Sequence, residues 1–330
     1  MPIAPVDSTR RRLLAGGLLA GAAWPLGALA AEPWPSRPVR FIVPFPPGGP
    51  VDTTARIASQ RLSEIWKTPT LIDNRAGAGG TVGATVAAKE APDGYSLFVG
   101  AIHHAVNPSL MGRLPYDIEK DFAPVSFAAV FPVFVVANAA VPANTIAELI
   151  ALAKKPGSQL SFGSSGNGGG THLAGELFNM EAGTKLLHVP YKGSAPAMND
   201  LLGGQVQLMF SDAPTALPHI RSGRIKVLGV ASPQRSAMLP SVPTVAESGL
   251  PGYEAYSWAA LFAPARTPQP VLDRINADFN TALRDAAVRQ RLLTAGAEAD
   301  PGTQQQMRER LSSELRKWAQ VVKVAGIQAD

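Results

Sequence analysis

The chain has 330 residues, with 30 Lys and Arg against 25 Asp and Glu and no cysteine. The absence of cysteine excludes thiolate nucleophiles, iron–sulfur clusters and cysteine-ligated zinc, and the near balance of charge, without a long basic run, gives no electrostatic support for nucleic-acid binding. The length exceeds what one hydrophobic core usually organises, so we expect two domains.

The first 30 residues have the composition of an export signal. A basic stretch at Arg10–Arg12 precedes an apolar segment at Leu13–Leu29, and small residues fit a cleavage site after Ala30 or Ala31. The paired arginines after a hydroxyl residue also match a twin-arginine signal. A retained membrane anchor is the alternative, but the apolar segment is short and rich in glycine against the roughly 20 residues that a span needs. We therefore predict a mature protein that works in the periplasm and is not embedded in the membrane.

The mature chain alternates short β-branched runs with helical stretches, in two successive series. This pattern predicts strands joined by crossover helices in mostly parallel sheets. In the first series we expect strands within residues 39–43, 68–74 and 95–101, and helices within residues 53–66 and 79–91. In the second series we expect strands within residues 125–138, 159–165, 186–191, 206–212 and 225–232, and helices within residues 145–153, 171–183, 195–204 and 218–222.

The end of the chain is strongly helical, at residues 268–285 and 301–324, and these helices have no obvious partner strand. We expect the chain to cross into the second domain near residues 127–135, to return near residues 256–262 and to pack its tail on the first domain. Two crossings make a hinge with a cleft between the domains. The predicted organisation is an export signal at residues 1–30, a first domain of residues 31–127 plus 258–330, and a second domain of residues 128–257.

Two glycine-rich turns stand at the same place in the two series, between the carboxyl end of a strand and the amino end of a helix. They are "PFPPGGPVD" at residues 44–52 and "SSGNGGGTH" at residues 164–172. Such a turn exposes unpaired backbone amides that the helix dipole reinforces, and it attracts anions, carboxylates included. In open α/β sheets, ligands bind beyond the carboxyl ends of the strands. We therefore expect the two turns to face each other across the cleft.

The prolines of the first turn matter as much as its glycines. Because they fix φ and remove donors, the amides of Gly48, Gly49, Val51 and Asp52 are predicted to be held in place before a ligand arrives, which lowers the entropic cost of binding. The alternative is a rigid connector in which Asp52 or Thr53 merely caps the helix.

Histidines follow two of the predicted strands. The pair His103 and His104 suggests a metal site, but adjacent histidines in an extended segment point to opposite faces, and no third ligand stands at metal-site spacing. His172 either lines the cleft from the first turn of its helix or is a capping or core histidine. Further polar residues follow predicted strands at residues 74–81, 100–108, 189–196 and 210–214.

Enzymatic motifs are incomplete in these turns. Asn167 stands where the nucleophile elbow G-x-S-x-G requires its last glycine if Ser165 is the nucleophile, and the glycine-rich turns lack the lysine of a phosphate-binding loop. A Ser165–His172 pair stays open as the basis of an exported α/β hydrolase. Asp52 and Asp212 are the two carboxylates in the predicted cleft turns, and each equally fits a helix cap or an amide acceptor.

Together, these segments resemble the extracytoplasmic solute receptors of tripartite tricarboxylate transporters (TTT), often called the Bug family. The resemblance runs in order from about residue 36 to residue 265 and so covers nearly all of the mature chain. It rests on "PFPPGGPVDTTAR", "DNRAGAGGTVGA", "APDGYSLFVG", "SSGNGGGTHLAGELF", "HVPYKGSAPAMNDLLGGQV", "IRSGRIKVLGVAS" and "PTVAESGLPGYEAYSW".

The resemblance implies an α/β fold of the periplasmic-binding-protein type II, a two-domain Venus flytrap whose mostly parallel sheets are flanked by helices. It implies a monomeric receptor without enzymatic activity, metal or cofactor. Such a receptor captures a small carboxylate (an organic acid, an acidic amino acid or an aromatic acid) and delivers it to TTT-type membrane transporter subunits. A sensory receptor of the same fold that signals to a membrane partner is the main alternative, and an exported α/β hydrolase is the lesser one.

The resemblance also implies which residues bind the ligand, largely through backbone amides and ordered waters. This chain departs from many relatives at Ala101–His104, where they have small hydroxyl residues, so Phe45 and the two histidines are expected either to stack on a ring or to hydrogen-bond a second carboxylate. The implied site residues are Phe45, Pro47, Gly48, Gly49 and Asp52 in the first turn, Ser164, Ser165, Gly166, Thr171 and His172 in the facing turn, and Gly79, Gly80, His103, Tyr191, Lys192 and Asp212 at further strand ends.

Overall fold

The computed structural model describes residue 1 and residues 34–327. The chain divides into two units, residues 1–36 and residues 37–330. In the first unit, the Trp34–Pro35 peptide bond is cis, and residues 2–30 of the predicted export signal lie outside the described residues. Every helix of the described residues is too short or too polar to cross a membrane. The fold below is that of the second unit.

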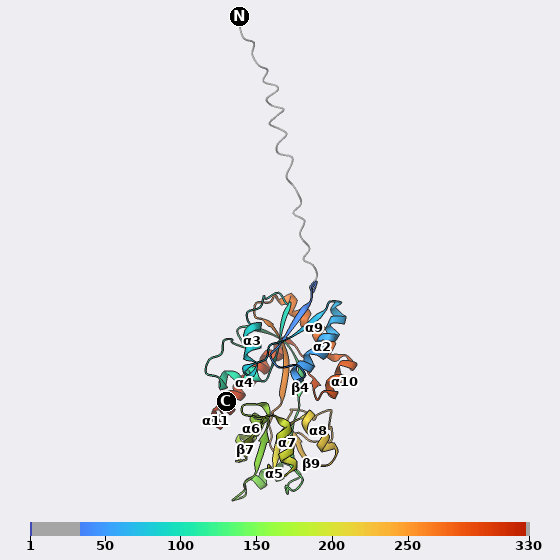
Figure 1. Ribbon diagram of the computed structural model, residues 1–330. Helices are drawn as coiled ribbons and strands as arrows, with labels where there is room; N and C mark the ends of the chain where they lie inside the picture. Colours follow the sequence, from blue (N-terminus) through green and yellow to red (C-terminus); the bar gives the residue numbers. More distant parts are fainter. Residues whose placement is uncertain (2–33, 328–330) are drawn as a thin grey trace. The chain divides into compact units, whose positions relative to one another are not determined.

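The first sheet has six strands in the order β11-β4-β10-β3-β1-β2 (Figure 1). β1 pairs in parallel with β2 and β3, whereas β10 is antiparallel to β3 and β4, and β11 is antiparallel to β4. The strands are β1 (Val39–Val43), β2 (Thr70–Asn74), β3 (Ser96–Ala101), β4 (Phe122–Phe131), β10 (Ser257–Pro264) and β11 (Glu298–Ala299).

The second sheet has five strands in the order β7-β6-β8-β5-β9. β6 pairs in parallel with β7 and β8, and β5 is antiparallel to β8 and β9. The strands are β5 (Val133–Asn138), β6 (Ser161–Ser164), β7 (Leu187–Pro190), β8 (Leu208–Asp212) and β9 (Ile225–Val230).

The two sheets repeat one strand order, as the two series in the sequence predicted. In each sheet, three parallel strands joined by helices are followed by one strand that runs against its neighbours, namely β10 in the first sheet and β5 in the second. The sheets are therefore mixed, with more antiparallel pairing than the sequence predicted. The physical reason is that the strands that precede β5 and β10 in the chain belong to the other sheet, so the direction of β5 and β10 is not set by a crossover helix within their own sheet.

Helices cover both sheets. Beside the first sheet, α2, α9 and α10 contact one another, and α4 packs against α11. Figure 1 shows α2 and α9 on one side of this sheet and α3 and α4 on the other side. α11 also contacts α6, a helix of the second sheet. The helices are α2 (Pro50–Trp66), the 3₁₀ turn η1 (Ala78–Gly80), α3 (Thr81–Ala87), α4 (His103–Leu110), α5 (Ile146–Ala153), α6 (Gly170–Ala182), α7 (Ser194–Leu202), α8 (Ala213–Arg221), α9 (Gln269–Arg284), α10 (Ala286–Thr294) and α11 (Gln304–Ala325).

Three expectations about the elements are wrong. His103 and His104 do not lie in an extended segment but open helix α4. The stretch at residues 125–138 is β-rich, as expected, and it holds the end of β4 and all of β5, separated by Pro132, which cannot donate to a strand ladder. The tail does have a partner strand, the two-residue β11, and α8 begins at Ala213, well before residue 218.

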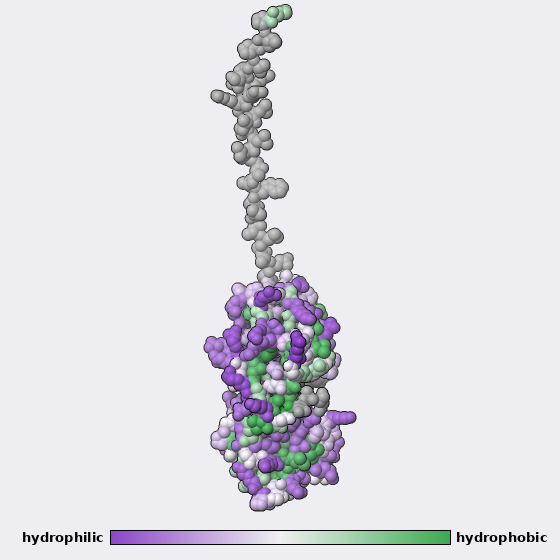
Figure 2. Space-filling model, turned by 90° about the vertical axis from the view of Figure 1, so that its left-hand side faces the viewer, coloured by the Kyte–Doolittle hydropathy of each residue, from purple (hydrophilic) through white to green (hydrophobic). Residues whose placement is uncertain are grey.

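A buried polar group ties the tail helix α11 to the first sheet. The Glu314 carboxylate is 3% exposed and accepts hydrogen bonds from the indole nitrogens of Trp258 in β10 at 3.2 Å and of Trp318 at 2.7 Å. Lys317 pairs with the same carboxylate, which offsets the cost of burying its charge. The tail therefore packs on the first sheet, as the sequence predicted. On the face that Figure 2 shows, hydrophobic residues gather around the level where the two sheets meet.

Candidate ligand-binding site

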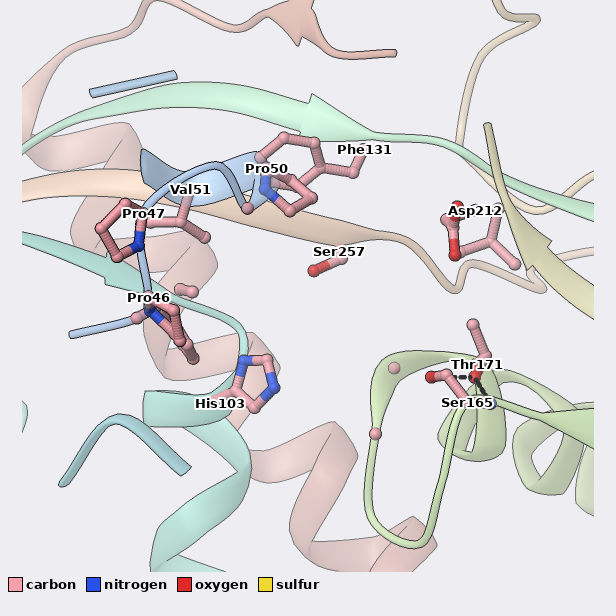
Figure 3. A pocket seen from close by; sticks show the side chains of 16 residues that line it. Pro46, Pro47, Pro50, Val51, His103, Phe131, Ser165, Thr171, Asp212 and Ser257 are labelled. Carbon is pink, nitrogen blue, oxygen red and sulfur yellow. Dashed lines mark hydrogen bonds between the residues drawn. The ribbon is translucent and has the colours of Figure 1, made fainter. Parts of the chain in front are cut away.

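A cavity of about 400 Å³ lies between loops of the two sheets (Figure 3). The first sheet contributes the β1–α2 turn and the start of α4, and the second sheet contributes the β6–α6 turn and the end of β8. The strands that cross between the sheets supply the remaining wall. The lining residues are Phe45, Pro46, Pro47, Gly49, Pro50, Val51, Ala101, His103, Phe131, Val133, Ser165, Gly169, Gly170, Thr171, Asp212 and Ser257.

The first turn is fixed by a buried carboxylate behind it. Asp52 is 1% exposed, and its side chain accepts hydrogen bonds from the Gly48 amide, from Nε of Arg56 and from Nδ2 of Asn74, each at 2.8 Å. Burial raises the pKa of Asp52, but the bonds from Arg56, Asn74 and Gly48 and the charge of Arg56 outweigh it, so that the pKa lies below its ordinary value. Asp52 therefore holds the turn from behind and does not line the cavity.

Backbone amides of the first turn remain available at the start of α2. Gly49 is the N-cap, has φ of −74° and makes no side-chain cap, and Pro50 begins the helix without a donor. In the described part of the chain, the amides of Gly49, Val51 and Asp52 have no hydrogen-bond partner, whereas that of Gly48 is occupied by Asp52. Three of the four amides named from the sequence are thus free at the end of a 17-residue helix.

Side chains of the second turn accept hydrogen bonds from several of its own backbone amides. The Ser165 amide donates to Oγ1 of Thr171 at 2.9 Å, the Gly166 amide to Oγ of Ser164 at 3.2 Å, and the Gly168 amide to Nδ1 of His172 at 3.0 Å. Within the described residues, the amides that stay without partners are those of residues 170–172, the first turn of α6. Each sheet therefore directs one helix N-terminus with free amides at the same cavity.

A stacked pair of imidazole rings lies beneath the second turn. The rings of His172 and His188 are 3.6 Å apart and nearly parallel at 8°. Nε2 of His188 is 2.7 Å from Oγ of the fully buried Ser164. Burial, and then the neighbouring His172, lower the pKa of His188 to about 4. Sequence reasoning missed His188 because it reaches Ser164 through the parallel pairing of β6 with β7, which no local pattern reveals.

The start of α4 presents one histidine to the cavity and buries the other. His103 lines the cavity beside the ring of Phe45, with ring centroids 4.9 Å apart, and its Nδ1 is buried without a hydrogen-bond partner. His104 is fully buried, with Nδ1 3.0 Å from the Ala101 amide nitrogen and Nε2 3.4 Å from the Gly80 carbonyl oxygen. Burial lowers the pKa of each ring to about 4, so both are neutral at physiological pH.

The remaining predicted residues divide into cavity lining and support. Asp212 lines the cavity, caps α8 by accepting from the Thr215 amide at 3.1 Å and accepts from Oγ of Ser194 at 2.6 Å. The Tyr191 hydroxyl donates to Asp200 at 2.7 Å, and burial and then that carboxylate raise the pKa of Tyr191 to about 12. Of the predicted site residues, Phe45, Pro47, Gly49, His103, Ser165, Thr171 and Asp212 line the cavity, whereas Gly48, Asp52, Gly79, Gly80, Ser164, Gly166, His172, Tyr191 and Lys192 do not.

Sequence reasoning did not single out part of the cavity wall. Phe131 and Val133 flank Pro132 where the chain crosses to the second sheet, and Ser257 stands where it returns. The predicted crossings near residues 127–135 and 256–262 contain all three, so the crossing itself was the available signal. The free amide of Gly170 was also missed, although the second turn that contains it was identified.

The polar groups of the site lack the geometry of a hydrolase. Oγ of Ser165 is 2.9 Å from Oγ1 of Thr171 (dashed in Figure 3) and bonds no histidine, while Nδ1 of His172 accepts from Gly168. Ser164 does contact a histidine but is fully buried. Among the described residues, there is no group of three or more His, Asp or Glu side chains that fits a metal ion. The lining residues include no Lys or Arg, so the attraction for an anion comes from the backbone amides and the helix dipoles.

Comparisons with known proteins identify the family. The model of the tripartite tricarboxylate transporter family receptor, TctC, matches residues 54–327. BugT of Bordetella pertussis is 37% identical over 318 residues, which are 96% of this chain and 98% of BugT. A solved structure described as a periplasmic transporter has a TM-score of 0.73 and 37% identity over 90% of this chain and all of its own. Rpa4515 of R. palustris, solved with adipate, has a TM-score of 0.73 and 35% identity over 89% of this chain and 99% of its own.

The family match begins two residues after the first glycine-rich turn, so it leaves out β1 and that turn but includes the second turn and the other strands of both sheets. It is a match to transport receptors, which agrees with the prediction of a protein that is not an enzyme. The resemblance inferred from the sequence motifs is thereby confirmed, and the chain belongs to the tripartite tricarboxylate transporter receptor family, whose Bug members it resembles over nearly its full length.

Proposed function

We propose that this receptor binds a small organic carboxylate in the cavity between its two sheets and delivers it to a membrane transporter of the tripartite tricarboxylate type. The observation that carries the proposal is the pair of helix N-termini, of α2 and α6, whose free amides border one cavity from opposite sheets. Each N-terminus is equivalent to roughly half a positive charge, and the amides donate hydrogen bonds without a counter-charge to displace. A carboxylate seated between them satisfies donors from both sheets at once.

Closure of the two lobes follows from the same geometry. We assign residues 31–127 plus 258–330 to one lobe and residues 128–257 to the other, joined where β4 continues into β5 and where the chain returns into β10. A ligand that contacts both lobes binds the closed arrangement more tightly than the open one, so it shifts the population towards closure. Small-angle scattering should report a smaller radius of gyration when ligand is added.

The cellular setting is part of the proposal. A solved relative, 37% identical, is described as a periplasmic transporter, and the basic and apolar pattern of residues 1–30 is that of an export signal. We place the mature protein in the periplasm as a monomer, with TTT-type membrane subunits as its partner. The relative solved with adipate, which carries two carboxylates, supports an organic acid as the ligand here.

A thermal-shift screen of organic acids tests the proposal. Ligand at a hundredfold excess over its Kd stabilises the folded state by about 2.7 kcal/mol, so we expect a few acids to raise the melting temperature by several degrees and most to leave it unchanged. The corresponding amides and methyl esters, which lack the negative charge, are the matched controls. A flat response across a broad acid library would overturn carboxylate capture.

A further inference from the structure

The wall of the cavity is apolar on the side of the first turn and the crossing strands. Phe45 and Phe131 contribute rings, and Pro46, Pro47 and Val133 contribute aliphatic surface (Figure 3). A ligand that contacts this wall must bury apolar surface of its own, because burying a polar group against it without a hydrogen bond costs free energy. The wall therefore selects a ligand with an apolar body, and its two rings favour a planar one.

The charges around the cavity compensate about one carboxylate. The N-termini of α2, α4, α6 and α8 border the cavity and supply roughly half a positive charge each, and the negative charge of Asp212, the N-cap of α8, cancels about half of that sum. The one charged side chain among the lining residues is Asp212, whose oxygens are held by the neutral donors Thr215 and Ser194, and Arg56, behind the first turn, is already paired with Asp52. A second carboxylate in the cavity would meet no basic side chain and would be repelled by Asp212.

His103 supplies one uncharged hydrogen-bonding group opposite the second turn. Its Nδ1 is buried and has no partner. A buried N–H without a partner is rarer than a buried acceptor without one, so the proton belongs on Nε2, the other ring nitrogen, and makes it a donor. The position of His103 at the N-terminus of α4 further disfavours a charged ring, in agreement with the pKa of about 4 that burial gives it.

We propose that the ligand is an aromatic monocarboxylate with an uncharged hydrogen-bonding group away from its carboxylate, and that His103 is the residue that selects for this group. This inference rests on the proposed function, since it assumes that the carboxylate lies between the N-termini of α2 and α6. The ring of the ligand lies along Phe45, and its polar group reaches Nε2 of His103. Relatives that take aliphatic dicarboxylates such as adipate differ from this receptor in that preference.

Calorimetric titration of the purified mature protein with four kinds of acid tests the substrate class. The probes are the three hydroxybenzoates, benzoate, terephthalate and adipate. We expect the best hydroxybenzoate to bind about tenfold more tightly than benzoate and at least a hundredfold more tightly than terephthalate or adipate. Tighter binding of either dicarboxylate would overturn the inference and leave the proposed function standing, whereas no binding of any acid in this and the wider screen would overturn the proposed function itself.

Substitutions at His103 test its role. We expect His103→Ala to weaken the best hydroxybenzoate about tenfold and to change benzoate by less than twofold, and we expect His103→Gln, which keeps a donor, to recover part of the loss. The control is Gly112→Leu, an exposed site outside the cavity where a Cβ meets no atom within 4 Å, and it should leave all affinities unchanged. Equal weakening of both ligands by His103→Ala, with the fold intact by circular dichroism, would overturn the selective role.

Discussion

The two turns that border the cavity occupy equivalent places in the two sheets but are held by different chemistry. In the first turn, proline rings fix the backbone, and the buried Asp52, charged and paired with Arg56, holds Gly48 from behind. In the second turn, hydroxyl and imidazole groups of Ser164, Thr171 and His172 hold the amides, and no ion pair takes part in these bonds.

This difference teaches that the same requirement, a set of backbone amides held in place before the ligand arrives, can be met in two ways. The first turn meets it by the rigidity of its prolines, and the second turn meets it by a network of side-chain hydrogen bonds. Proline fixes φ whatever the solvent, and a carboxylate with a lowered pKa stays charged throughout the neutral range. Both turns hold glycines in the left-handed region, Gly48 in the first and Gly166 and Gly168 in the second, but the second turn has no proline and rests on hydroxyl groups and imidazole rings, of which that of His188 has a lowered pKa. We therefore expect the second turn to be the more deformable and the more sensitive to acid.

The largest expected effect comes from filling the space in front of the free amides. Gly49 and Gly170 both line the cavity, neither has a positive φ, and a Cβ at either meets nothing closer than 3.7 Å. Gly49→Leu and Gly170→Leu should therefore fold normally and each weaken ligand binding more than a hundredfold, which corresponds to about 2.7 kcal/mol. Calorimetry measures the loss. If only one of the two variants loses binding, the ligand is held by one turn and the symmetric picture is wrong.

The next prediction compares the stability contributed by the Asp52–Arg56 pair, which supports the first turn, with that of an ion pair nearer the surface. Asp52→Asn removes the charge that pairs with Arg56, which keeps only its bond to Asn74, and should cost roughly 2–3 kcal/mol of unfolding free energy, less than for a fully buried pair because Arg56 is half exposed. Denaturant titration measures this cost. The matched control is Asp73→Asn, whose carboxylate pairs with Arg40 and Arg75 nearer the surface and should cost less than about 1 kcal/mol. Equal losses of unfolding free energy in the two variants would show that Asp52 stabilises the fold no more than a surface carboxylate does.

Local patterns predicted those parts of the fold and of the candidate site that local chemistry determines. Apolar periodicity predicted β1 and α2, and the glycines and prolines between them marked the first turn, since such residues serve at strand-to-helix turns wherever they occur. The same signals predicted β6, α6 and the second turn. Because equivalent turns in a repeated sheet lie at equivalent edges, their convergence on one cavity also followed from the sequence.

Features that depend on distant contacts were not predictable in this way. Helix α4 begins at His103 without a side-chain cap, so the sequence contains no start signal, and the histidine pair was wrongly taken as extended. Phe131 joins the cavity wall because β4 ends exactly where the chain changes sheets, and His188 supports the second turn through strand pairing. The two residues of β11 are too few for any periodicity to identify them.

A smaller effect is expected from acid, and it tests the second turn. The pKa of His188 falls from its ordinary 6.5 to about 4 on folding, so between these values the unfolded chain binds a proton that the folded chain does not. This contribution to stability is complete above about pH 6.5 and is lost as the pH falls towards 4, by less than about 1.4 kcal/mol per pH unit because the ring is only half buried. His188→Gln should flatten the fall of stability between pH 6.5 and 4.5 relative to the parent protein. A slope identical to that of the parent would show that His188 does not contribute to the acid sensitivity of the second turn.

The smallest expected effect concerns the hydroxyl that closes the second turn. Oγ1 of Thr171 accepts from the Ser165 amide and bonds Oγ of Ser165, each at 2.9 Å, and a net hydrogen bond contributes about 1 kcal/mol. Thr171→Val keeps the shape and removes both bonds, so it should lower the unfolding free energy by roughly 1–2 kcal/mol and weaken ligand binding severalfold. Thr171→Ser, which keeps the hydroxyl, should bind almost as well as the parent. The prolines of the first turn need no such hydroxyl. Loss of binding in Thr171→Val with restoration in Thr171→Ser would therefore show that the second turn is the more deformable of the two. Equal behaviour of the two variants would assign Thr171 to packing alone.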